Sequence, residues 1–426
     1  MKFKEGLLIL GGPGRRQRGS EHNMTHRRRP PRGFIALGVI CAVAATGVVA
    51  SASNAKSNAA SPIIIGAAVA KTGTIAYFDS QAYNSFLLYV NKVNAAGGVA
   101  GHPIKVLFSD THSDIAHTPQ VAQGLISRGA KILLVSCDFD YGSPAALVAQ
   151  KAGDTSWTLC ATSPKFGVQG IGDKAYDVNI AGGLLGDILA TYAKQRGWKA
   201  PYVLTDRSLV AMITQCNGFQ QVWNSLGGKV VGTDTFLNTD SSISTQITKI
   251  QAAKPDFLVV CSYPPGGALA IRQLRSAGVT VPILSTDGMD GTSWVKSVPN
   301  ISNMYITAHA SIFGGSPQIA AYLKEYKATY HSSPTGGFAV TGYALAQTIV
   351  GALKQTNGNP DGSALKAVLD KFTNFPTIEG PVTFTPTVHI QLNRPLPIIE
   401  FSNGKPHYVT TVKPAVPGSL SMGATT

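Results

Sequence analysis

From Ser61 onward, short apolar runs rich in β-branched residues alternate with longer stretches in which apolar residues recur at helical spacing. The run at 62–68 predicts a strand, and the spacing of Ala82, Phe86 and Val90 predicts a helix after it. The alternation continues to residue 180 and predicts a first β/α unit. Further strands are expected at 104–109, 131–136 and 155–160, and further helices at 118–127 and 144–151.

The same alternation starts again after residue 180. Strands are expected at 202–205, 229–236, 257–262 and 281–285, and helices at 184–196, 210–226, 243–253 and 268–277. Strands that alternate with helices of this length favour parallel sheets covered by helices, and two such runs favour two sheets. The predicted fold class is therefore α/β, with two doubly wound parallel-sheet lobes.

The last third of the chain breaks this rhythm. Helices are expected at 319–330, 340–354 and 363–371, and short strands at 382–384, 388–392, 396–401 and 408–411. We interpret this tail as a return of the chain to the first lobe and then to the second, which implies a hinge of several crossovers. The predicted domains are lobe 1 at 61–180 plus 308–380, lobe 2 at 181–307 plus 381–412, and a flexible tail at 413–426.

The net charge of +14 on 426 residues is concentrated at the start of the chain. Residues 1–60 hold ten of the 36 Lys and Arg residues and only two of the 22 acidic residues. The remainder is mildly basic, and it contains no basic cluster interleaved with aromatic residues of the kind that binds nucleic acid. No nucleic-acid partner is expected.

Residues 1–55 are predicted to be an upstream extension and a signal peptide. A basic run at 27–29 precedes an apolar stretch at 34–50 and small residues at 50–52 (ASA), which is typical of a secretory signal. Cleavage is expected near Ala52 to Ala55, and Met24 is a second candidate for the start of translation. A retained membrane anchor is the alternative. The mature chain is expected to be exported, to the periplasm, the cell envelope or the outside, and to meet the membrane only through a partner.

Four cysteines follow the predicted cleavage site: Cys137, Cys160, Cys216 and Cys261. An even number in an oxidising compartment permits two disulfides, with three possible pairings. Cys137 and Cys160 both end predicted parallel strands of the first lobe, so they could pair with each other. Buried free thiols are the alternative for some of them.

The chain lacks the common signatures of catalysis and cofactor binding. It contains no phosphate-binding loop, no H-E-x-x-H, no C-x-x-C and no G-x-S-x-G motif, and its histidines do not pair at metal-ligand spacing. We therefore expect no enzymatic activity, no cofactor and no metal.

Four short segments carry a resemblance to a known family. They are 76–79 (AYFD), 94–101 (NAAGGVAG), 110–114 (DTHSD) and 162–164 (TSP). Together they resemble the leucine/isoleucine/valine-binding family of type I periplasmic binding proteins, over about residues 61 to 408. The resemblance implies the two-lobed fold, no catalysis, and a role as the substrate-binding protein of an ABC importer. It also implies permease subunits as partners, and an amino acid, an amide or a small organic acid as the ligand.

The resemblance also implies ligand-binding positions, all of which lie in loops that follow strands or begin helices. In such α/β sheets, ligands bind beyond the carboxyl ends of the strands. A serine of the family, at the turn of residues 138–141, would join Thr162 in holding a ligand carboxylate, and Asp287 would face an ammonium group. The implied positions are Tyr77, Phe139, Asp140, Tyr141, Cys160, Thr162, Val210, Tyr263 and Asp287.

This chain departs from the family pattern in two places. The turn at 138–141 has no serine and carries two carboxylates, which would repel a ligand carboxylate in a partly dry site. Val210 stands where the family commonly has an aromatic residue, so a wider or more apolar pocket is expected.

Structural roles remain open for several of these residues. Tyr263 could be a packed loop aromatic, and Asp287 could cap a turn or helix. Thr162 and Cys160 could serve strand packing. Two other functions also remain open: a ligand-sensing module with the same fold, and an exported enzyme.

Overall fold

The computed structural model describes residues 60–416 and 418–423. The predictions for the signal peptide, its cleavage site and the start of translation lie outside the described residues. In the part of the chain that is described, no helix is long and apolar enough to cross a bilayer.

The first sheet is entirely parallel and has the order β2-β1-β3-β4-β5. Its central strands are buried along their whole length, as expected for parallel strands covered by helices on both faces. Its strands are β1 (Ile63–Val69), β2 (Ile104–Asp110), β3 (Ile132–Val135), β4 (Thr155–Thr158) and β5 (Ala175–Tyr176).

The second sheet has the order β14-β13-β10-β9-β8-β6-β7. Five of its strands run parallel, whereas β13 and β14 join one edge in the antiparallel direction. The predicted α/β class with two parallel-sheet lobes is therefore confirmed, with an antiparallel edge added. The strands are β6 (Pro201–Asp206), β7 (Gly232–Phe236), β8 (Phe257–Cys261), β9 (Ile283–Ser285), β10 (Met304–Thr307), β13 (Leu396–Ser402) and β14 (Lys405–Val412).

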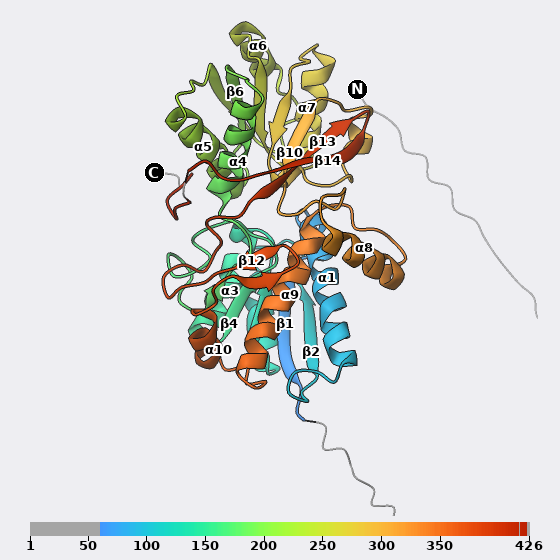
Figure 1. Cartoon of the computed structure of the whole chain (residues 1–426), viewed down its shortest axis with the longest axis vertical. Helices are drawn as coiled ribbons and strands as arrows, with labels where there is room; N and C mark the ends of the chain where they lie inside the picture. The colour runs from blue at the N-terminus through green and yellow to red at the C-terminus, as the bar shows by residue number, and fades with distance from the viewer. Residues whose placement is uncertain (1–59, 417, 424–426) are drawn as a thin grey trace, which may run out of the picture. The chain divides into compact units, whose positions relative to one another are not determined.

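We call the first sheet and the helices packed on it the first lobe, and the second sheet with its helices the second lobe. Figure 1 shows the late helices α8 and α9 beside α1 and α10 near β4, although these elements are far apart in sequence. The helices of the first lobe are α1 (Ala76–Ala95), α2 (Thr118–Ser127), α3 (Phe139–Ala152), α8 (Pro317–Tyr330), α9 (Phe338–Gln355) and α10 (Gly362–Leu369). Those of the second are α4 (Gly182–Gln195), α5 (Val210–Ser225), α6 (Ser244–Ala253) and α7 (Gly266–Ser276).

Three segments of the described chain carry the backbone between the lobes (Figure 1). Residues 177–181 lead from β5 to α4, and residues 308–316 lead from β10 to α8. Residues 383–395 lead from the small hairpin of β11 (Phe375–Thr377) and β12 (Gly380–Val382) to β13. The exact lobe boundaries given above stay a prediction. Within the predicted tail, the amides of Ala415 and Val416 donate hydrogen bonds to Asp187 of α4.

Helices α4 and α5 cross at unusually close range because glycines face each other. A Cβ atom at Gly186 or Gly218 would collide with the backbone of the facing helix. This crossing holds α5 against β6 and β8 and so places the N-terminus of α5 beside the carboxyl ends of the strands.

Two local predictions were wrong. The helix expected from residue 144 begins at Phe139, because Asp138 caps it, so residues 138–141 are a helix start and not a separate turn. The strand expected at 388–392 is absent from the structure, where this segment makes only isolated bridges, one of them from Gln391 to Ile180. Strand β10, in the middle of the second sheet, was not predicted.

Candidate ligand-binding site

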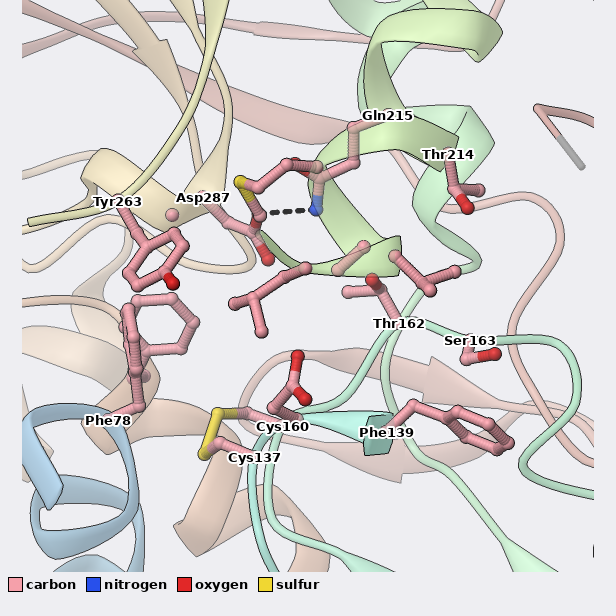
Figure 2. A pocket seen from close by; sticks show the side chains of 17 residues that line it. Phe78, Cys137, Phe139, Cys160, Thr162, Ser163, Thr214, Gln215, Tyr263 and Asp287 are labelled. Atoms are coloured by element: carbon pink, nitrogen blue, oxygen red, sulfur yellow. Dashed lines mark hydrogen bonds between the residues drawn. A yellow bond between two sulfur atoms is a disulfide. The ribbon is translucent and has the colours of Figure 1, made fainter. Parts of the chain in front are cut away.

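A pocket lies between the two lobes, at the carboxyl ends of strands from both sheets. Cys137 follows β3 and Cys160 follows β4 on one side, while Tyr263 follows β8 and Asp287 follows β9 on the other. Parallel α/β sheets generally bind ligands at this position. Figure 2 shows side chains from both lobes converging on the same space.

The first-lobe wall is anchored by the buried carboxylate of Asp79 in α1. Its Oδ1 accepts hydrogen bonds from the Cys137 amide at 2.7 Å and the Ser136 hydroxyl at 3.0 Å. Its Oδ2 accepts a bond from the Ala70 amide at 2.7 Å. Burial raises the pKa of Asp79 to about 6 despite these donors. The carboxylate therefore ties the loops after β1 and β3 together beneath the pocket.

Asp138 is the N-cap of α3 and lines the pocket. Its Oδ1 accepts hydrogen bonds from the amides of Asp140 at 2.9 Å and Tyr141 at 3.3 Å. Its Oδ2 accepts no hydrogen bond from any described residue, although the side chain is mostly buried. Burial, followed by the charge of Asp140, raises the pKa of Asp138 to about 7. One carboxylate oxygen is thus available to a ligand.

Asp287, on the second-lobe side, belongs to the 3-10 turn η1 (Asp287–Met289) and is held by two neighbours. Gln215 Nε2 donates to its Oδ1 at 2.7 Å (Figure 2), and His309 Nε2 lies 3.0 Å from its Oδ2. Burial lowers the pKa of His309, but the hydrogen bond and charge of Asp287 outweigh this effect and leave the pKa raised. The Asp287 carboxylate thus favours the charged form of the His309 imidazole.

An aromatic cluster forms one side of the pocket. The rings of Phe78 and Phe338 are 4.9 Å apart between centroids, and those of Phe78 and Tyr263 are 6.5 Å apart. Leu209 and Met212 of the second lobe add aliphatic surface. Such a surface suits the apolar body of a small ligand.

Neutral hydroxyl groups lie on the opposite side. Figure 2 places Thr162, Ser163 and Thr214 across the pocket from Tyr263 and Phe78. These side chains can donate or accept hydrogen bonds, so they do not by themselves select a ligand charge.

The N-terminus of α5 reaches the pocket and is capped from the other lobe. Its N-cap residue, Leu209, has no side chain that can accept a hydrogen bond. The Val210 amide donates instead to Asp140 Oδ2 at 3.3 Å. A carboxylate of the first lobe thus occupies the end of a helix dipole in the second lobe.

The structure brings six of the predicted site residues together around the pocket. They are Phe139, Cys160, Thr162, Val210, Tyr263 and Asp287.

The other three predicted residues, Tyr77, Asp140 and Tyr141, lie outside the pocket lining. Tyr77 Oη donates to the carbonyl of Asp290 at 2.7 Å, and Asp140 bonds to Val210. Both therefore make contacts between the lobes. Tyr141 is partly buried behind the cap of α3. A role of any of these nine residues in ligand binding stays a prediction.

Several lining residues were missed by the sequence analysis. Phe78 directly follows Tyr77 and could have been found from that neighbour. Gln215 lies more than one helical turn inside α5, and Phe338 begins a helix of the distant tail, so only the tertiary fold brings them to the pocket. His309 contacts Asp287 from a crossover segment that carries no recognisable motif.

The four cysteines form two disulfides, each inside one lobe. Cys137 pairs with Cys160 just beyond the carboxyl ends of β3 and β4, and Cys216 of α5 pairs with Cys261 of β8. Among the described residues, no group of three or more His, Cys, Asp or Glu side chains is arranged to hold a metal ion.

Comparisons of the sequence with known proteins agree with this architecture. The sequence profile of a family described as periplasmic binding protein matches residues 62–406. The Leu/Ile/Val-binding protein homolog 3 of Brucella melitensis is 23% identical over 327 residues, covering 76% of this chain and 88% of the relative. An amino acid binding protein of Pseudomonas aeruginosa is 24% identical over 303 residues, covering 70% of this chain and 78% of the relative.

Solved structures share the fold at low sequence identity. The branched-chain amino acid transporter substrate binding protein LivJ from Streptococcus pneumoniae, in complex with isoleucine, superposes with a TM-score of 0.73 at 23% identity. That match covers 83% of this chain and 100% of LivJ. A solute binding protein of an ABC transporter from R. palustris, in complex with benzoate, gives a TM-score of 0.71 at 19% identity and covers 85% of this chain and 99% of its own.

Proposed function

Because this chain belongs to the periplasmic binding protein family, we propose that it is the exported solute-binding protein of an ABC importer. It captures a small organic solute in the pocket between its lobes and presents it to permease subunits in the membrane. It performs no chemical reaction on the solute.

The pocket shared by the two lobes is the observation that carries this proposal. Phe78, Asp138 and Thr162 come from the first lobe, whereas Met212, Tyr263 and Asp287 come from the second. A ligand that contacts both sets stabilises the closed arrangement over an open one. The crossover segments between the lobes would act as the hinge of this closure.

The proposed ligand is an amino acid, an amide or a small organic acid. Relatives named for leucine, isoleucine and valine, and a neighbour solved with benzoate, support this size and chemistry. The aromatic cluster of Phe78, Tyr263 and Phe338 would cover the apolar part of the solute.

Eight of the nine predicted residues have a role in this proposal, and Tyr141 has none beyond its place behind the cap of α3. Those that line the pocket would touch the ligand, and Tyr77 and Asp140 would favour the closed arrangement through their contacts across the lobes. The predicted lobe boundaries at 180, 307 and 380 fall close to the crossover segments.

An extracytoplasmic location is part of the proposal. The basic and apolar leader supports export, and the two cysteine pairs suit an oxidising compartment. A sensing module with the same fold would bind its ligand in the same way but report to a receptor. Association of the purified chain with permease subunits distinguishes transport from sensing.

The test is ligand binding without turnover. One sample of the purified full chain is denatured and searched by mass spectrometry for released small molecules. A second, folded sample is titrated calorimetrically with amino acids, amides, organic acids and primary amines. We expect saturable binding and a rise in melting temperature, with the ligand recovered unchanged. Failure of the whole panel to bind, or conversion of a ligand to a product, would contradict the proposal.

A further inference from the structure

We infer that the pocket selects an organic cation, a primary amine with an apolar body, and that Asp138 is its ionic partner. A ligand that carries a carboxylate is disfavoured. This inference rests on the proposed function, the capture of a small organic solute, and replaces the ligand classes named there by one that carries an ammonium group and no carboxylate.

The charged groups of the pocket lining are all acidic. Seventeen residues line the pocket, and among them Asp138 and Asp287 are the charged ones, with no Lys, Arg or His. The Asp287 carboxylate already has partners in Gln215 and His309. Asp138 is therefore the carboxylate whose charge is left for a ligand to balance.

Asp138 has both the position and the free atom for this role. Its Oδ1 is used by the amides of Asp140 and Tyr141, whereas its Oδ2 has no partner among the described residues. The residue is only 7% exposed, so a charge there is poorly solvated. An ammonium group at Oδ2 would form a charge-assisted hydrogen bond in place of the missing solvent.

The surroundings of Asp138 add negative charge and no compensating cation. Asp79 lies beneath it and Asp140 follows it in α3, and both raise its pKa through their charge. Within 60–416 and 418–423, none of these three carboxylates forms an ion pair with a basic side chain. A ligand carboxylate placed next to these three carboxylates would be repelled.

The donors that commonly bind an anion at such a site are already used by the protein's own carboxylates. The N-terminus of α3 is capped by Asp138, and the Val210 amide at the start of α5 bonds to Asp140. Neutral donors remain in the pocket lining: the amides of Ala211 and Met212 in the first turn of α5, and the hydroxyls of Thr162, Ser163, Thr214 and Tyr263. These donors favour an anionic ligand group, whereas Asp138 favours a cationic one. The experiment below measures which group the pocket prefers.

The aromatic cluster also favours a cation. Phe78, Tyr263 and Phe338 gather on one side of the pocket that Asp138 also lines. The faces of aromatic rings attract ammonium groups and also cover apolar carbon, so an amine with a short branched or aromatic body suits both.

Two matched series of ligands test the inference on the full chain at pH 8. The first consists of 3-methylbutylamine, leucine and 4-methylpentanoate, and the second of 2-phenylethylamine, phenylalanine and 3-phenylpropanoate. Each series keeps the apolar body and changes only the charged groups. We expect the amine to bind at least ~10-fold more tightly than the other two members in one series or both, as for a buried ion pair.

The outcomes separate this inference from the proposed function. If leucine, phenylalanine or either acid binds more tightly than its matched amine, the inference is overturned and the proposed function stands. If neither series binds but an amide of the wider panel does, the inference is again overturned and the proposed function stands. If nothing in either panel binds, both fail.

A variant pair locates the ionic partner. Asp138→Asn keeps an oxygen that caps α3, because Asn is as good an N-cap as Asp, but it removes the charge. We expect it to lose ~10-fold or more of the amine affinity. The control is Asp361→Asn, since Asp361 caps α10 in the same way, far from the pocket. Unchanged amine binding by a folded Asp138→Asn protein would overturn the assignment, and Asp138→Ser, another good cap, replaces it if the first variant does not fold.

The pH dependence gives a second, independent measurement. Asp138 has a pKa of about 7 and faces Asp79 of α1, Asp140 and Tyr141 of α3, and Tyr263 of the second lobe. Amine binding is therefore expected to strengthen from pH 6 to pH 8 as Asp138 loses its proton, and to lose this dependence in Asp138→Asn. A ligand acid that binds better at pH 6 than any amine does at pH 8 would show instead that protonated Asp138 donates to a carboxylate.

Discussion

The hydroxyl of Tyr77, in α1 of the first lobe, donates a hydrogen bond of 2.7 Å to the carbonyl oxygen of Asp290, which follows η1 in the second lobe. The two residues are 213 positions apart in sequence. With the bond from Val210 to Asp140, this contact joins the lobes on the rim of the pocket without lining it. The two lobes are thus joined by hydrogen bonds between protein groups, to which the contacts of a ligand would add.

Tyr77→Phe is expected to weaken ligand binding although Tyr77 does not line the pocket. Under the proposed closure of the lobes, loss of this hydrogen bond should cost about 1 kcal/mol, or about a fivefold loss of affinity. Calorimetric titration measures the affinity, and small-angle scattering of the ligand-free chain measures the share of the open form, which should increase. Tyr89→Phe is the control, because Tyr89 lies on the same helix and its hydroxyl bonds to no described residue. Equal affinity of the two variants would contradict the role given to Tyr77.

The folded protein should become less stable as the pH rises from about 4 to about 7. Burial, the largest cause in each case, raises the pKa of Asp79 to about 6 and those of Asp138 and Asp290 to about 7. A carboxyl group whose pKa is raised by folding binds more protons in the folded state, so its contribution is complete below the unfolded pKa of 3.8 and is lost through the folded pKa. Urea denaturation at pH 5 and pH 8 measures the free energy of unfolding, which should be higher at pH 5.

Asp290→Asn isolates one of these groups. The buried Asp290 Oδ2 accepts a bond from the Gly337 amide, which an Asn oxygen can also accept, and its Oδ1 is unpartnered. Relative to the natural protein, the variant should gain at least about 1 kcal/mol of stability between pH 5 and pH 8, since one pKa unit corresponds to about 1.4 kcal/mol. The exposed Asp256→Asn is the control. Parallel pH profiles for all three proteins would refute this attribution.

Most of the elements could be predicted from the sequence because each has its own periodic pattern. Helices α2, α5 and α6 begin and end within one or two residues of the predicted bounds. The start of α3 was missed although its signal was present: Asp138 is a preferred N-cap residue, and its oxygen accepts two of the first free amides. The resemblance to the family of leucine/isoleucine/valine-binding proteins is confirmed by the family match over 62–406.

The site was predictable only where it follows directly from a strand end. Thr162, Tyr263 and Asp287 stand in such positions and line the pocket. Phe338 and His309 reach the region through chain segments that return from far along the sequence, and no local pattern encodes that return. The sequence shows that residues 138–141 differ from the family pattern. It does not show that Asp138 caps a helix there and keeps one free carboxylate oxygen, because this depends on the path of the backbone.

The close crossing of α4 and α5 predicts opposite effects for two helical glycines. Gly186→Ala should destabilise the protein by about 1 to 3 kcal/mol, because the new Cβ would collide with the α5 backbone. Gly124→Ala in α2 meets open space and should stabilise it by about 0.5 to 1 kcal/mol through helix propensity. Thermal and urea denaturation of both variants measures the difference. An increase in stability for both variants would show that the crossing can relax without cost.

The two disulfides should differ in their effect on binding and not in their effect on stability. They link residues 23 and 45 positions apart, so removal of either should cost about 3 to 4 kcal/mol by the loss of loop constraint in the unfolded chain. Cys137 and Cys160 line the pocket, and Cys137 directly precedes Asp138 in the sequence. Cys216 and Cys261 are buried in the second-lobe core.

Paired Cys→Ala variants and calorimetry separate the two effects. The double variant of Cys137 and Cys160 should lose both stability and ligand affinity, because the loops after β3 and β4 would no longer hold Asp138 and Thr162 at a fixed separation. The double variant of Cys216 and Cys261 should lose stability alone, provided that the assay temperature keeps both proteins folded. Equal loss of affinity in both would mean that the disulfide at the pocket acts only through global stability, and that the position of Asp138 is set by Asp79 and the helix cap.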